Sequence, residues 1–167
     1  MSQHTTIRPA SAVKALVVAT LAGAAFGASS ALLPFLKLNA IVLLGGVTIS
    51  FVVHLALQRG MLANLAVGLV SAALAVFAMW ALWFGLEHGF ATLASVLAQG
   101  PKGIRATLET LGASARVSVR LSGGTRTTHG PEDMRLFWLI ETVLMAAGPI
   151  FGALLSPLLQ RRQSAVA

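Results

Sequence analysis

The sequence predicts an all-α membrane protein built as a bundle of four transmembrane helices. Three observations lead to this prediction. Only 10% of the 167 residues are charged, whereas a soluble domain carries about a quarter. The mean hydropathy is +0.82. The charged residues also leave four long gaps, each close to the roughly 20 apolar residues that a helix needs to cross a bilayer.

The four gaps without Asp, Glu, Lys or Arg define the expected spans. They contain 22 residues after Lys14, 21 after Lys37, 27 after Arg59 and 19 after Glu141. Core helices of a soluble protein would need polar outer faces, which these segments lack. We therefore expect membrane-spanning helices at about 13–33, 38–57, 61–85 and 136–160.

The first expected helix follows a polar N-terminal tail, residues 1–13. Its basic start and the Ser29-Ser30-Ala31 stretch would also fit a cleaved signal peptide. Because the apolar run continues past this stretch and soon meets the next span, we favour an uncleaved helix. Pro34 disfavours helical conformation at the residue before it, which predicts a tight turn between the first two spans.

The second and third spans are separated by a short polar turn. Gly60 stands where a C-terminal helix cap is expected. Trp80 and Trp83 fall near the far end of the third span, where aromatic side chains favour the membrane interface. Residues 86–99 are still apolar, so they either extend the third helix or lie along the membrane, and they complete a transmembrane unit of residues 14–99.

Residues 100–135 form a basic extramembrane loop that carries six of the twelve Lys and Arg residues. Its first part has apolar residues at helical spacing, namely Ile104, Leu108 and Leu111. This spacing predicts a short amphipathic helix at the level of the lipid headgroups. Residues 115–122 then alternate between apolar and polar before Gly123-Gly124, a pattern that fits a small β-hairpin, although isolated two-stranded hairpins are marginally stable.

The fourth helix has a clear beginning. Pro131, Glu132 and Asp133 suit a first helical turn, where proline is tolerated and acidic side chains favour the helix dipole. Pro149, in the middle of the span, is expected to bend it. A basic C-terminal tail, residues 161–167, follows the span.

Small residues at a period of four mark the faces on which the helices are expected to pack. In lipid, close backbone approach drives helix association more than apolar contact does. The first helix carries such residues at Ala15, Ala19, Gly23, Gly27 and Ala31, and the fourth at Gly148, Gly152 and Ser156. We expect the first helix to be the centre of the bundle, packed on the third or fourth helix. A homodimer through the same face is the alternative.

Four spans place the 1–2 turn and the 3–4 loop on one side of the membrane, here called the loop side. Glu141 stands ~8 Å inside the fourth span at ~1.5 Å rise per residue, and a charged group at the bilayer centre costs about 2.5–3.5 kcal/mol on insertion scales. Lys37, Glu87 and His88 fall on the same side and form a candidate polar cluster with Glu141. In a structural role, the cluster is an ion pair or a hydrogen-bond anchor for the loop. In a functional role, it is a proton or cation relay, or part of a substrate site.

The sequence assigns no catalytic residue, no metal site and no cofactor. The absence of cysteine excludes disulfides, thiol catalysis and thiolate metal sites. Glu87, His88 and Glu141 could hold a divalent ion, but their spacing is not diagnostic. His54 is expected to bond to Asn64 or to a backbone carbonyl rather than to a ligand. Since no nucleophile–base pair stands at useful spacing, we lean against an enzyme, and one acting on lipids ranks last.

The net charge of +7 would suggest nucleic acid in a soluble protein. Here the basic residues lie at helix ends and in the loop, so topology signals and headgroup contacts explain them without nucleic acid. Docking of a partner protein or of anionic lipid is the alternative role of the loop. The loop side carries seven basic residues and the terminal side five. The five lie closer to the spans, so we expect both termini in the cytoplasm of a bacterial-type inner membrane.

The sequence therefore predicts a small multi-pass membrane protein without a readable reaction. We interpret it as a non-enzymatic subunit, or an accessory or scaffold protein, of a membrane assembly, with the lipid bilayer and a protein partner or second copy as its contacts. The alternative is a small oligomeric transporter or channel that uses Glu141 as an intramembrane carboxylate.

Overall fold

The structure is a computed structural model that describes residues 9–33, 36–57, 60–114, 117–120 and 126–166. Within these ranges, four helices are long and apolar enough to cross a membrane. They are α1 (Pro9–Leu32), α2 (Leu36–Leu55), α3 (Met61–His88) and α6 (Pro131–Val166). The prediction of four helices of membrane-spanning length is confirmed. The helix α6 continues through both of its internal prolines.

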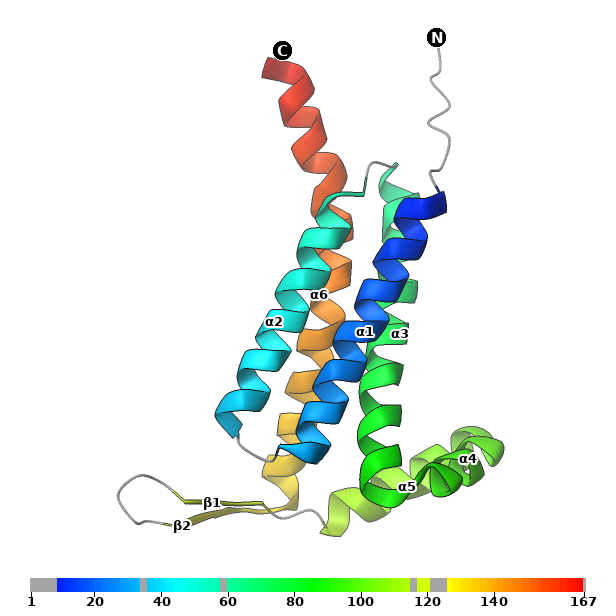
Figure 1. Cartoon of the computed structure of the whole chain (residues 1–167), viewed down its shortest axis with the longest axis vertical. Helices are drawn as coiled ribbons and strands as arrows, with labels where there is room; N and C mark the ends of the chain where they lie inside the picture. Colours follow the sequence, from blue (N-terminus) through cyan, green and yellow to red (C-terminus); the bar gives the residue numbers. More distant parts are fainter. Residues whose placement is uncertain (1–8, 34–35, 58–59, 115–116, 121–125, 167) are drawn as a thin grey trace.

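The four spans form a ring. In this ring α1 packs on α3, α3 on α6, α6 on α2, and α2 on α1 (Figure 1). Since successive spans reverse direction, α1 runs parallel to α3 and α2 runs parallel to α6. The helix α1 is thus one corner of the bundle rather than its centre, as expected when four helices each pack against two neighbours.

Glycine brings the backbones of α1 and α3 into contact. Gly23 and Gly27 are buried, and a Cβ atom at Gly23 would overlap the carbonyl group of Ala75, while one at Gly27 would overlap that of Met79. Two further small residues of the same α1 face are fully buried, namely Ala15 and Ala19. This face is therefore occupied by α3, which accounts for its small residues without the alternative homodimer.

The helices α2 and α6 also meet through close backbone contacts at glycine. A Cβ atom at Gly148 would lie 2.6 Å from the carbonyl oxygen of Val47, and one at Gly152 would overlap the carbonyl oxygen of Phe51. All four glycines that the sequence marks for packing thus lie at backbone contacts between helices. Close approach of this kind is what drives association in lipid.

A side chain of α2 caps the end of α1. With its nitrogen oriented to donate, the side-chain amide of Asn39 reaches the carbonyl oxygens of Ser29 and Leu33 at 3.1 Å each. Ser29 lies in the last turn of α1, where its carbonyl also accepts from the Leu33 amide at 2.8 Å, and Leu33 follows directly after the helix. Asn39 therefore fixes the antiparallel α1–α2 pair at the loop side.

The helix α3 ends at a glycine in the left-handed region. Gly89 has φ +91°, a conformation that residues with a Cβ atom rarely adopt. The chain turns there into α4 (Phe90–Ala98) and then into α5 (Gly100–Ser114). Residues 86–99 are therefore divided between the end of α3 and a separate helix. We call residues 90–114 the arm, which lies across the direction of the spans at the loop side (Figure 1).

Two short strands follow the arm. They are β1 (Val117–Arg120) and β2 (Arg126–His129), which pair antiparallel with Val117 opposite His129. Residues 121–125, between the strands, lie outside the described residues. The arm and the strands lie at one end of the bundle, and the beginning of α1 and the end of α6 lie at the other (Figure 1).

Candidate functional site

Among the described residues, no hydrogen bond or ion pair joins Glu87, His88 and Glu141 of the predicted polar cluster. Glu87 and His88 are exposed in the last turn of α3. The ring of His88 packs against its own helix, with its centroid 5.8 Å from that of Trp83 and 4.7 Å from that of Phe84. A shared function of the cluster stays a prediction.

Glu141 lies half-buried on the face of α6 that meets α2. It stands seven residues before Gly148, which contacts Val47, so the parallel register puts it at the level of Ala40 on α2. Lys37 lies about one turn before Ala40 in α2, and its side chain is outside the described residues. Among the described residues, Glu141 makes no ion pair or hydrogen bond.

Three tryptophans join α3 to α6 at the loop side. The ring centroid of Trp80 lies 5.4 Å from that of Trp83 and 5.7 Å from that of Trp138, both at nearly perpendicular angles. The indole nitrogen of Trp80 donates to the hydroxyl of Thr142 at 3.0 Å, and this hydroxyl donates to the carbonyl of Trp138 at 2.7 Å. The tryptophans expected near the interface thus also connect two helices of the bundle.

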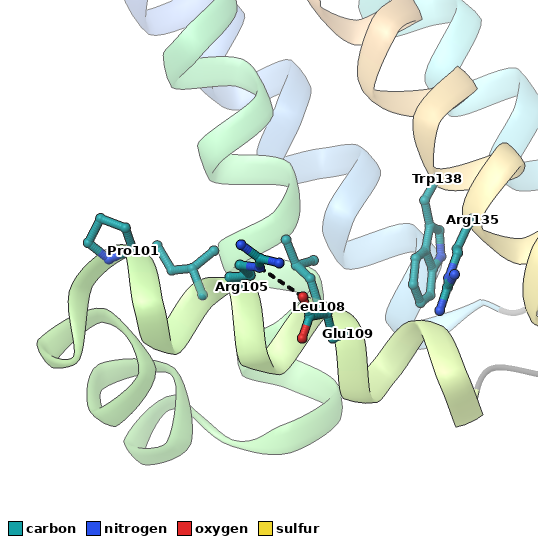
Figure 2. Close-up of a pocket in the computed structure, with 7 residues that line it drawn as sticks. Pro101, Arg105, Leu108, Glu109, Arg135 and Trp138 are labelled. Atoms are coloured by element: carbon teal, nitrogen blue, oxygen red, sulfur yellow. Dashed lines mark hydrogen bonds and ion pairs between the residues drawn. The ribbon is translucent and has the colours of Figure 1, made fainter.

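An open groove lies beside this aromatic cluster, between α5 and the beginning of α6. Its volume is about 570 Å³, and it is lined by Pro101, Ile104, Arg105, Leu108, Glu109, Arg135 and Trp138. In Figure 2, Arg105 and Leu108 rise from α5 on the side of the spanning helices, and Arg135 and Trp138 reach down from α6. The groove therefore lies where the arm meets the bundle.

The charges of the groove are two guanidinium groups and one carboxylate. The Nε atom of Arg105 donates to Glu109 at 2.8 Å, in an exposed pair one turn apart on α5. The guanidinium of Arg135 lies on the backbone of Gly112, where an added Cβ atom would come within 2.7 Å of its Nε atom. Arg135 has no ion pair within the described ranges, so the groove keeps one uncompensated positive charge.

A second polar site lies inside the bundle, near the terminal side. His54 of α2 is fully buried, with its Nδ1 atom 2.7 Å from the carbonyl oxygen of Ser50 and its Nε2 atom 2.7 Å from the hydroxyl of Ser71 on α3. A carbonyl only accepts, so Nδ1 carries the proton and Nε2 accepts from Ser71. The expected bond to a backbone carbonyl is present, while the partner on α3 is Ser71 rather than Asn64.

The helix α6 completes this polar junction. The hydroxyl of Ser156 donates to the carbonyl of Leu57, just after α2, and Asn64 is fully buried on α3. We call Ser50, His54, Asn64, Ser71 and Ser156 the buried junction. Although Ser71 and His54 resemble a nucleophile and its base, both are fully buried, so a substrate does not reach them in this conformation. The junction is suited to holding three helices together.

Comparisons with family models, with curated proteins and with solved structures find no match to this chain. In the part of the chain that the structure describes, no three His, Cys, Asp or Glu side chains come together as a metal site would require.

Proposed function

We propose that this chain is a non-enzymatic subunit or accessory protein of a membrane assembly, and that α4 is its attachment surface. The observation that carries the proposal is the exposure of α4, whose nine residues read FATLASVLA and include none that is buried. Phe90 and Leu97 are its largest exposed side chains. Because α4 lies outside the four spans, its uncovered apolar side chains are available to a partner protein or to lipid.

The packing of the bundle supports a scaffold more than a conduit. Backbone contacts at Gly23 and Gly148 bring neighbouring helices together without intervening side chains. The buried junction satisfies His54 from within the bundle. A closely packed four-helix frame with an uncovered arm suits a protein that positions a partner.

The sequence of α5 supports a place for the arm at the membrane surface. This helix carries Lys102 and Arg105 among its exposed residues and directs Leu108 into the groove. A short amphipathic helix with basic residues lies in the headgroup region, with its apolar side toward the lipid. The arm then presents α4 to a neighbouring membrane protein. We propose that both termini face the cytoplasm, which an enzyme reporter fused at the C-terminus would check, since activity only outside the cytoplasm would contradict it.

The first prediction tests α4 in intact membranes. A photo-crosslinking amino acid at Leu97 is expected to yield one discrete protein adduct, because this side chain is 40% exposed on a helix that the bundle leaves uncovered. The matched control is Leu69, a leucine of α3 that is 51% exposed in the middle of a span, where adducts with lipid are expected. The measurement is the mass and peptide composition of the adducts.

If Leu97 forms only lipid adducts, as Leu69 does, and the extracted chain is a lone monodisperse monomer, the scaffold proposal is wrong. A protein adduct whose mass equals two copies of this chain would identify the partner as a second copy.

A transporter or channel is the second candidate function, and Glu141 favours it. This half-buried carboxyl lies within a span and has no ion pair or hydrogen bond among the described residues. Ionisable groups inside the membrane are expensive and usually serve a purpose. In an oligomer of the chain, a conduit that uses this carboxyl would pass the α2–α6 face on which Glu141 lies.

Replacement of this carboxyl separates the two functions. Under the scaffold proposal, Glu141→Gln keeps any proton flux in proteoliposomes within about twofold of the unchanged protein. It raises Tm by about 2–4 °C, because an amide avoids the cost of burying a charge. Glu87→Gln, at an exposed position of the same side, is the control and should change neither quantity. Loss of flux in Glu141→Gln alone would establish the transporter instead.

A further inference from the structure

We infer that the groove between α5 and α6 binds the headgroup of an anionic phospholipid. The inference rests on the proposed function only for the membrane placement of the arm. It uses a different surface from α4, which is the proposed attachment surface.

The apolar part of the groove suits an acyl chain. Ile104 and Leu108 remain 41% and 51% exposed although both line the groove. Leu139, one turn after Arg135 on α6, is also exposed, and residues four apart lie on the same helix face. A chain that leaves the groove toward the bilayer centre therefore continues along apolar surface.

The polar part of the groove suits a phosphate. The guanidinium of Arg135 is held against Gly112 and has no ion pair in the described part of the chain. Arg105, with a side chain that is 82% exposed, turns into the same groove beside its partner Glu109. A guanidinium group can donate two parallel hydrogen bonds to phosphate oxygens. Glu109 accepts from only one N–H group of Arg105 in this structure, so the remaining N–H groups of the two arginines can donate to a phosphate.

The position of the tryptophan agrees with this occupant. Trp138 lines the groove near the loop-side end of the span, and its indole nitrogen has no hydrogen-bond partner among the described residues. Tryptophan favours this level of a bilayer because its ring is apolar and its N–H is polar. Free phosphate would leave Ile104 and Leu108 uncovered, whereas a phospholipid satisfies the apolar and the charged parts of the groove together.

Net charge decides between kinds of headgroup. Two guanidinium groups and one carboxylate leave the groove at +1. An anionic headgroup such as phosphatidylglycerol neutralises this charge. Phosphatidylcholine carries a positive choline group beside its phosphate, and Glu109, the carboxylate that could pair with choline, is already paired with Arg105. The groove should therefore select against the zwitterionic lipid.

Retention of lipid by the purified full chain tests the inference. The chain is incubated in detergent with dioleoyl phosphatidylglycerol or dioleoyl phosphatidylcholine, and native mass spectrometry counts the bound lipids. Retention of phosphatidylglycerol is expected to be at least about fivefold stronger, since each basic residue near an anionic headgroup contributes about this factor. Arg135→Gln and Arg105→Gln should each remove about fivefold, and Glu109→Gln should increase retention.

The control variant keeps the test specific. Lys102→Gln removes one charge from the same helix at a position that does not line the groove, and it should stay within about twofold. Arg105 is exposed, so its replacement tests the site even if Arg135→Gln disturbs the packing on Gly112. Inorganic phosphate at millimolar concentration should not displace the lipid.

Three results would overturn the inference. They are equal retention of the two lipids, equal loss in Lys102→Gln and in the arginine variants, and displacement by inorganic phosphate. Each leaves the crosslinking result at Leu97 untouched, so the groove and the attachment surface fail or succeed separately.

Discussion

Gly23→Ala is expected to destabilise the bundle, whereas the same substitution at Gly45 should leave it unchanged or slightly more stable. A Cβ atom at Gly23 would overlap the carbonyl of Ala75 on α3, and a backbone carbonyl cannot rotate away as a side chain can. The two helices must separate, and forced overpacking of this kind costs about 1–3 kcal/mol. At Gly45 nothing lies within 4 Å of the added atom, so only the helix preference for alanine, up to ~1 kcal/mol, remains.

The free energy of unfolding of the two variants, measured in mixed micelles with increasing denaturing detergent, checks this prediction. Gly27→Ala should behave like Gly23→Ala, because its Cβ atom would overlap the carbonyl of Met79. A Gly23→Ala protein as stable as the Gly45→Ala protein would show that α1 and α3 are not in backbone contact.

His54→Ala is expected to have the other large effect, about 3 kcal/mol of lost stability. The substitution removes the imidazole that bonds to the Ser50 carbonyl and to the Ser71 hydroxyl. It also leaves a space where the imidazole ring stood, because His54 is fully buried inside the bundle. Cavity formation and an unsatisfied buried hydroxyl both contribute to the cost.

A double-mutant cycle isolates the bond between α2 and α3. Ser71→Ala, His54→Ala and the double variant should give a coupling energy of about 0.6–1.7 kcal/mol, the range measured for hydrogen bonds between membrane helices. Ser95→Ala, on the exposed helix α4, is the control and should change little. A coupling near zero would mean that the buried junction does not stabilise the bundle.

The number of spans could be predicted from the sequence because the thickness of the bilayer sets their length. The gap of 27 residues after Arg59, for example, corresponds to α3, which runs Met61–His88. The packing glycines were also visible, since a residue that repeats every fourth position stays on one helix face. Gly23 and Gly152 illustrate this, as both lie where a neighbouring backbone comes close.

The ring of helices and the break after α3 could not be predicted in the same way. Residues 86–99 are apolar throughout most of their length, and only the positive φ of Gly89 separates α4 from α3. The bond between His54 and Ser71 depends on how two helices are rotated about their axes. The side of the membrane was assigned for Glu141 and His88, but sharing a side does not bring side chains together.

The groove was missed for a related reason. Arg105 and Arg135 are 30 residues apart in the chain, and the sequence assigns both to a basic loop. Only the turn at Gly89 and the lateral course of α5 bring them to opposite sides of one groove. The available signal was the apolar spacing of Ile104 and Leu108, which predicted an amphipathic helix but not the element that it meets.

The parallel pairing of α1 with α3 has a consequence for biosynthesis. These two helices share the most extensive interface of the bundle, yet α2 separates them in the chain. Translation delivers α1 and α2 to the membrane first, so the alanine–glycine face of α1 contacts lipid until α3 is made. The imidazole of His54 likewise lacks its hydrogen-bond partner Ser71 until α3 is made. The order in which the ribosome supplies the helices therefore differs from the order in which they pack. A nascent chain that stops before α3 contains α1 without the helix on which it packs most extensively.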